Sequence, residues 1–178
     1  MLVKLSEAWA KAELLAAALL AFAVTCLILL NVATRTLGAA LFWVDELAIY
    51  AMVWMTFLGA SAAIHFGHSI SITILTDALS DPLTKLAQRM VDVVVLAFAL
   101  AMLWFCWIWF LPFEIARFGF DTEAFQGSTF NFIYAEPTTT LGVKKWMVWL
   151  VMWLFAIGAT LHAVANLFRP HRVRQITA

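Results

Sequence analysis

The chain has 178 residues, of which 65% are hydrophobic and only 12% are charged, and its mean hydropathy is +0.93. An average soluble domain has about 45–50% apolar and about 25% charged residues, so this composition excludes an ordinary soluble protein. The formal net charge is zero, and no overall basic field indicates nucleic-acid binding.

The chain contains four long apolar stretches without a charged residue. They are Leu14–Leu30, Leu47–Ile64, Val93–Phe113 and Trp146–Leu161. A hydrocarbon core of about 30 Å takes roughly 20 helical residues, and each stretch reaches that length with its flanking residues. We therefore predict an all-α membrane protein with a single integral membrane domain over residues 1–178. Its four transmembrane helices are expected at about 12–35, 44–66, 82–113 and 144–168.

The distribution of positive charge predicts how these helices are oriented. If the helices alternate in direction, seven lysine and arginine residues share the side of the two termini and four lie on the other side. The seven are Lys4, Lys11, Lys85, Arg89, Arg169, Arg172 and Arg174, and the four are Arg35, Arg117, Lys144 and Lys145. Because short loops rich in lysine and arginine stay inside, we predict that both termini are cytoplasmic.

The residues before the first apolar stretch form an amphipathic segment. Between Met1 and Lys11, apolar side chains recur at helical spacing beside charged ones: Leu2, Leu5 and Trp9 beside Lys4, Glu7 and Lys11. This pattern predicts a short N-terminal lead that lies on the membrane surface and anchors the chain.

Polar residues gather where the first helix ends and the second begins. Asn31 and Arg35 lie four residues apart on one helix face, and Asp45 and Glu46 open the second helix at the same depth. An arginine–carboxylate contact across the turn is therefore expected, either as an ordinary interfacial ion pair or as a cluster that also faces a partner. Trp43 stands where an aromatic ring prefers the headgroup layer.

The second span contains a patch of small residues from Gly59 to Ala63. Gly59 and Ala63 have the four-residue spacing that lets two helix backbones approach closely. We expect a neighbouring helix to pack there.

A connection of about 30 residues, Glu114–Val143, links the third and fourth spans. Pro112 is expected to end or kink the helix before it. Connections longer than about 12–15 residues are usually functional or locally structured. Aromatic and acidic residues alternate through it: Phe118, Phe120, Phe125, Phe130, Phe132 and Tyr134 with Asp121, Glu123 and Glu136. Two interpretations stay open, an interfacial hairpin resting among the headgroups and a docking surface for another subunit.

The sequence contains no nucleotide-binding loop, no nucleophile with a paired base and no Cys/His metal spacing, so no catalytic, cofactor-binding or metal-binding residue is predicted. Cys26 and Cys106 fall inside spans and are interpreted as small packing residues. His65, His68 and His162 lie near the predicted cytoplasmic ends of helices. They raise the alternative of a four-helix membrane cytochrome with a b-type haem, or of another membrane-anchor subunit. Contacts with headgroups or a partner also account for histidines at this depth.

The spans also lack the features by which a transporter binds its solute. They show no internal repeat, discontinuous helix or polar site at the bilayer midplane. We therefore expect that the chain does not carry a solute by itself.

A set of motifs in the first two helices resembles one known family. The motifs are Asn31-Val32-x-x-Arg35, Trp43-x-Asp45-Glu46-Leu47, Trp54-x-x-Phe57-Leu58-Gly59-Ala60-x-Ala62-Ala63 and His65-x-Gly67-His68-x-Ile70. They are similar to those of the small (Q) membrane subunit of tripartite ATP-independent periplasmic (TRAP) transporters. The chain departs from the family pattern at His65, where an arginine is common, so an ionic contact there would depend on pH. The connection after the third helix is also longer than the family leads us to expect.

The resemblance implies an accessory permease subunit of the bacterial inner membrane. In such systems a periplasmic protein captures an organic acid, such as a C4-dicarboxylate, and a large multi-helix subunit moves it together with sodium ions. The small subunit braces the large one, so the sodium ions are expected in the large subunit and no cofactor is expected here. The interface or structural candidates are Asn31, Arg35, Trp43, Asp45, Glu46, Trp54, Gly59, Ala63, His65 and His68. The candidates for contact with the binding protein are Phe118, Phe120, Asp121, Glu123, Phe125 and Glu136.

Overall fold

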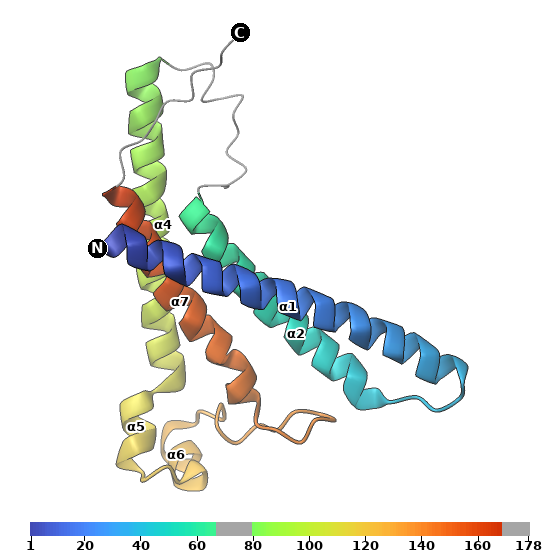
Figure 1. The fold of residues 1–178 in the computed structure, drawn as a ribbon. Coiled ribbons are helices and arrows are strands. Elements are labelled where there is room, and N and C mark those ends of the chain that lie inside the picture. Colours follow the sequence, from blue (N-terminus) through green and yellow to red (C-terminus); the bar gives the residue numbers. More distant parts are fainter. Residues whose placement is uncertain (67–79, 169–178) are drawn as a thin grey trace.

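A computed structural model describes residues 1–66 and 80–168 of the chain, and these residues form six helices (Figure 1). The helices are α1 (Leu2–Thr36), α2 (Phe42–Phe66), α4 (Asp81–Phe110), α5 (Pro112–Arg117), α6 (Thr122–Thr129) and α7 (Lys145–Leu167). Four helical segments are long and apolar enough to cross a membrane: α1, α2, Pro82–Arg117 and α7. The predicted all-α fold with four spanning helices is confirmed, and the cytoplasmic placement of the termini stays a prediction.

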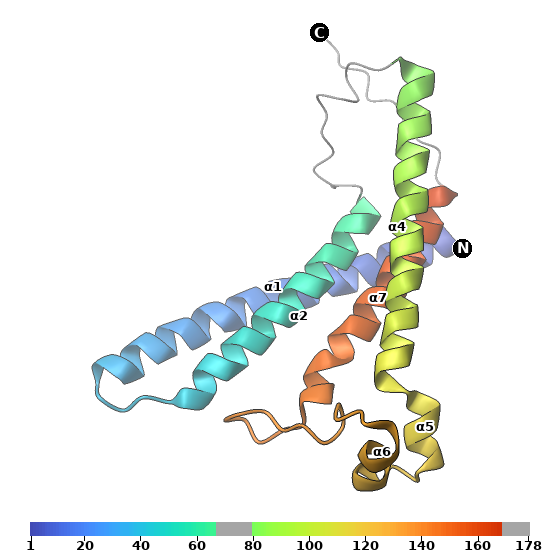
Figure 2. The same ribbon diagram turned by 180° about the vertical axis from the view of Figure 1, so that it is seen from behind.

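The long helices form two pairs that pack against each other. α1 and α2 make an antiparallel hairpin, α4 packs against α7, and α2 joins the pairs by packing against α7. Figures 1 and 2 show the hairpin leaning away from the α4–α7 pair, with the start of α1 beside the end of α7. We call the end that holds the start of α1 and the ends of α2 and α7 the histidine end. The opposite end, with the α1–α2 turn and residues 111–144, is the loop end.

α1 differs from the predicted arrangement of a separate lead and span. It runs unbroken from Leu2 to Thr36, because this stretch contains no proline or glycine to interrupt it. Ser6, Ala10, Glu13 and Ala17 are buried, and their spacing of three or four residues places them on one face of the helix. The lead therefore packs into the bundle with this face, as a continuation of the first span.

The third spanning segment is broken at Leu111 and Pro112, in agreement with the prediction that Pro112 ends or kinks this helix. α4 stops at Phe110, and Leu111 adopts a left-handed conformation with φ 43° before Pro112 begins the short helix α5. Proline suits the first turn of a helix because its missing N–H has no intrahelical acceptor there. The helix is thus interrupted at the loop end, and the chain enters the long connection through α5.

Small and aromatic residues build the contacts between the helices. One buried cluster joins Ala17, Leu58 and Val151 of α1, α2 and α7, and another joins Ala99 of α4 to Phe155 and Ala159 of α7. α7 is the most buried of the four long helices. Most large side chains of α1 and α4 point outward, as expected where lipid is the solvent. α7 is therefore the central support of the fold.

Candidate functional site

Asn31, Arg35 and Asp45 form a closed polar contact at the loop end. Arg35 donates from Nη2 to Asp45 Oδ2 at 2.5 Å and from Nε to Asn31 Oδ1 at 2.9 Å, and Asn31 Nδ2 donates to Asp45 Oδ1. The predicted contact across the turn is confirmed. The Arg35 and Asp45 side chains are 56% and 38% exposed, so the ion pair contributes only about 0–1 kcal/mol. Its main effect is to fix the geometry of the hairpin.

Glu46 points away from this contact and holds the long connection instead. Its carboxylate accepts backbone N–H groups from Thr139, Thr140 and Leu141 at 2.8, 2.6 and 3.1 Å. It also accepts the Thr140 hydroxyl at 2.6 Å and the Tyr50 hydroxyl at 2.9 Å. Hydrogen bonds to an ionised carboxylate are stronger than neutral ones. Two adjacent acids at the start of α2 therefore serve two different connections, which sequence reasoning had grouped together.

The connection between α4 and α7 is folded around aromatic side chains. Phe125 of α6 is fully buried and lies edge-on to Phe118 and Tyr134, with ring centroids 6.4 and 5.4 Å apart. The Tyr134 hydroxyl donates to the carbonyl oxygen of Phe110 at 2.6 Å, and its partial burial raises the pKa of Tyr134. The connection thus has local structure, one of the outcomes expected from its length.

The acidic residues of the connection have different environments. Asp121 caps α6 by accepting the N–H groups of Glu123 and Ala124 at 2.9 and 3.1 Å, while the Glu123 side chain stays exposed. Glu136 pairs with Lys145 at 2.7 Å. Of the residues predicted to contact a binding protein, Phe120 is 73% exposed and Phe125 is 0% exposed. Phe125 therefore supports the loop from inside, whereas Phe120 and Glu123 lie on its surface.

The remaining α2 candidates divide between internal contacts and an open face. Trp54 Nε1 donates to the carbonyl oxygen of Val148 at 2.8 Å, which ties α2 to α7. Trp43 is 40% exposed at the loop end. A Cβ added at Gly59 would have nothing within 4 Å, so no described helix of this chain packs at Gly59. Ala63 lines a cavity of about 310 Å³ between α2, α4 and α7. His68 lies outside the described residues.

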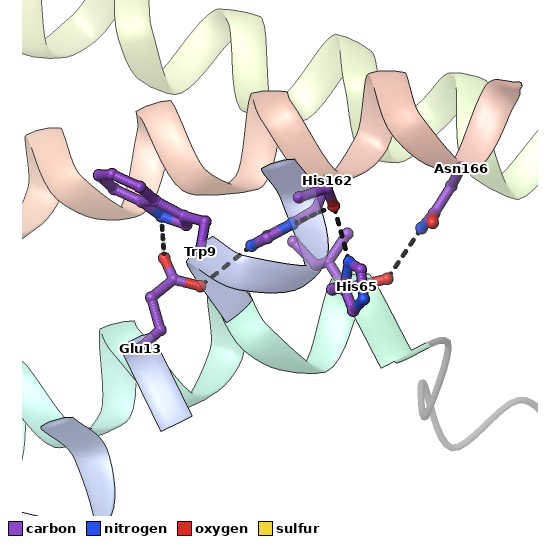
Figure 3. Close-up of polar contacts among 7 residues, drawn as sticks. Trp9, Glu13, His65, His162 and Asn166 are labelled. Atoms are coloured by element: carbon purple, nitrogen blue, oxygen red, sulfur yellow. Dashed lines mark hydrogen bonds and ion pairs between the residues drawn. The ribbon is translucent and has the colours of Figure 1, made fainter. Parts of the chain in front are cut away.

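Sequence reasoning missed a buried polar cluster at the histidine end, which Figure 3 shows between α1, α2 and α7. The hydroxyl oxygen of Ser6 lies 2.6 Å from His65 Nδ1 and 2.8 Å from His162 Nδ1. His162 Nε2 lies 3.0 Å from Glu13 Oε2, and Trp9 Nε1 donates to Glu13 Oε1 at 2.8 Å. We call these five residues the histidine cluster. The Ser6, Glu13, His65 and His162 side chains are at most 5% exposed.

Gly158 makes room for this cluster. A Cβ at this position of α7 would collide with the Glu13 carboxylate, the Ser61 hydroxyl and the Trp9 indole. Buried charges are costly unless they are paired and hydrogen-bonded, so Glu13 depends on this close approach. Two features of the sequence could have indicated this cluster. Ser6 and Glu13 lie on the same helix face as Ala10 and Ala17, and Gly158 stands four residues before His162.

The geometry of the cluster gives no support to the cytochrome alternative. His65 and His162 stand with ring centroids 5.2 Å apart, and both direct Nδ1 to the Ser6 hydroxyl between them. Among the described residues, no group of three or more His, Cys, Asp or Glu side chains is arranged to hold a metal ion. The Ser6–His162–Glu13 chain has the elements of a catalytic relay, but its hydroxyl is fully buried. Its evident effect is to join three helices.

Comparison with known protein families gives a match. The family model described as "Tripartite ATP-independent periplasmic transporters, DctQ component" matches residues 24–173 of the 178-residue chain. No curated protein and no solved structure matches. The matched range contains the loop-end contacts, the open face at Gly59, and both histidines of the cluster, and it begins after Glu13.

Gly158→Ala is expected to destabilise the fold because its Cβ would displace the Glu13 carboxylate from the cluster. Overpacking of this kind costs about 1–3 kcal/mol, which should lower the melting temperature of the purified chain in detergent. Gly59→Ala is the matched control, because its Cβ enters open space and alanine favours a helix. Equal melting temperatures for the two variants would contradict the proposed close packing.

Glu46→Gln is expected to loosen residues 139–141, because a neutral amide accepts their N–H groups less strongly. Amide hydrogen exchange should become several-fold faster at Thr139–Leu141, while the amide of Phe125, which bonds to Asp121, keeps its rate. Asp45→Asn is the control and should leave exchange at 139–141 unchanged. Unaltered exchange in Glu46→Gln would show that other contacts hold this segment.

Proposed function

The chain belongs to the DctQ component family of tripartite ATP-independent periplasmic transporters, and from this premise we propose that it braces the large membrane subunit of such a transporter. It is the small subunit of a TRAP transporter and a multi-pass protein of the inner membrane. The family works in a complex with a large membrane component and a periplasmic binding component. It is a family of transporter components and not of enzymes.

The observation that carries the bracing proposal is the open face at Gly59. Small residues at this spacing favour close helix packing in membranes, and the position of a Gly59 side chain is unoccupied. Gly59 and Ala63 are only partly buried, and Ala60 between them is exposed. The middles of the four apolar stretches carry no charged side chain, which suits support better than solute binding. We propose that a helix of the large subunit packs at Gly59 and enlarges the immobile part of the transporter.

In this arrangement the histidine end faces the cytoplasm and the loop end faces the periplasm, as the positive-inside rule predicts. The exposed Phe120 and Glu123 would then lie where a docked binding protein is nearest. The transported compound would be an organic acid such as a C4-dicarboxylate. The large subunit would move it together with sodium ions, without a cofactor in this chain.

Gly59→Leu is expected to abolish or strongly reduce co-purification with the large subunit, because a bulky side chain blocks close helix approach. The measurement is the ratio of the two subunits after affinity purification of the co-expressed complex. Ala18→Leu, which enlarges an exposed residue of α1, is the matched control. The isolated Gly59→Leu chain should melt like the parent, so loss of assembly is separable from misfolding. Full assembly and uptake by Gly59→Leu would refute the placement of the partner helix.

Phe120→Ala combined with Glu123→Gln is expected to lower uptake at limiting concentrations of the binding protein and to leave assembly with the large subunit intact. The physical reason is the loss of an exposed aromatic and an acidic contact at the loop end. Phe22→Ala, at an equally exposed phenylalanine of α1, serves as the control. Uptake in proteoliposomes that is unchanged at every concentration of binding protein would place the docking surface elsewhere.

A further inference from the structure

The histidine cluster is not used by the bracing function, yet it buries titratable groups from three helices. Glu13 comes from α1, His65 from α2 and His162 from α7, and Ser6 links the two imidazoles. Each ring nitrogen and oxygen in these contacts is within 3.0 Å of its partner. At such distances every contact needs one hydrogen and one acceptor, so the positions of the hydrogens are constrained.

The first constraint comes from Ser6. A serine hydroxyl has one hydrogen to donate, and it approaches two imidazole Nδ1 atoms. It donates to one ring and accepts from the other, so one of the two Nδ1 atoms carries a hydrogen. The second constraint comes from Glu13, whose Oε1 accepts from Trp9. An ionised carboxylate only accepts, so His162 Nε2 carries a hydrogen toward Oε2.

With an ionised Glu13 and a neutral His65, two hydrogen-bond patterns satisfy both constraints. In the first, His65 Nδ1–H donates to Ser6, Ser6 donates to Nδ1 of a neutral His162, and His162 Nε2–H donates to Glu13. In the second, His162 is doubly protonated and donates to both Ser6 and Glu13, while Ser6 donates to His65 Nδ1. The patterns differ by one proton, by the direction of the Ser6 hydroxyl and by the tautomer of His65.

The two patterns carry different net charges. The first leaves the Glu13 carboxylate as one negative charge inside the bundle, whereas the second pairs it with an imidazolium and is neutral. A buried unpaired charge is much more costly than a hydrogen-bonded ion pair. The protonated pattern is therefore the one that stabilises the contact among α1, α2 and α7.

The other charged side chains described at this end are engaged elsewhere or exposed. On α1, Glu7 and Lys11 pair with each other at 2.7 Å on the exposed face, and Lys4 is exposed. On α4, which packs against α7, Arg89 donates to the carbonyl oxygen of Leu167, and Asp92 lines the cavity beside Ala163 and Asn166. In the described structure, His162 is the group that meets the Glu13 carboxylate as an ion-pair partner.

We propose that Ser6, Glu13, His65 and His162 form one buried proton-binding site, whose proton keeps the first turns of α1 docked on α2 and α7. The docked state binds one more proton than separated helices, which retain a solvated carboxylate and a neutral imidazole. Docking is therefore complete at the lower pH and is lost as the pH rises through release of this proton. Because α1 contacts α7 here, the proton controls one of the contacts between the two helix pairs.

The direct test is nitrogen NMR of the histidine side chains in the full chain, reconstituted in nanodiscs and titrated from about pH 6 to about pH 8. The expected result is a doubly protonated His162 with His65 protonated at Nε2 at the lower pH. A neutral His162 with a change in the His65 tautomer is expected at the higher pH. A His162 that stays neutral throughout, or one that titrates without any response of His65, would overturn the proposal. This test needs no variant that might fail to fold.

The movement is tested by electron–electron distance measurements between spin labels at Lys4→Cys and Leu83→Cys, with Cys26 and Cys106 replaced by alanine. Both labelled positions are exposed, on α1 and α4. The parent should lose its short-distance population as the pH rises. Glu13→Gln keeps a hydrogen bond to each neighbour without a charge, so it should stay docked at every pH. Glu7→Gln, on the exposed face of the same helix, should behave like the parent. Equal pH dependence in Glu13→Gln and the parent, or none in the parent, would refute the site.

Discussion

The contact between Glu13 and His162 is the interaction on which the arrangement of the helices depends. A carboxylate at the edge of a membrane domain must find a partner, and here the partner lies 149 positions away on the last long helix. The contact requires a glycine at position 158, because any side chain there would occupy the space of the carboxylate. It also places Ser6 between two imidazoles, which draws α2 into the same joint. The cluster thus ties the first turns of α1 to both α2 and α7.

The two ends of the bundle are held together by different kinds of interaction. At the loop end the polar groups are exposed, and each of their ion pairs is weak. Several backbone N–H groups donate to the Glu46 carboxylate, however, and together they fix the position of residues 139–141. At the histidine end the groups are few and buried, so each hydrogen bond is costly to lose. Between the ends, dispersion contacts and small residues fill an interior without charge. A middle of this kind suits the bracing role proposed for the chain.

The four spans were predictable because a bilayer imposes a minimum length and excludes charge, and both requirements are visible in a linear sequence. The Arg35–Asp45 contact was predictable because a short turn leaves the two residues few alternatives. The partners of Glu13 and Glu46 were not, because both carboxylates bind groups more than 90 positions away. From the sequence, no role is predicted for Glu13, and Glu46 is grouped with Asp45 in the contact with Arg35. Phe125 shows the same limit, since composition does not reveal which aromatic residue of a loop lies inside it.

Gly59 and Gly158 are both glycines in apolar helices, but their surroundings differ. Both stand four residues before another small or polar residue of the same face. At Gly158 the chain's own side chains fill the space, so the glycine is explained by the fold. At Gly59 no side chain of the described structure fills the corresponding space, and the neighbouring residues are small. In a membrane, where lipid gives apolar faces little reason to associate, close backbone approach is a main source of helix affinity. The space left open at Gly59 is therefore where the proposed helix of another subunit would fit.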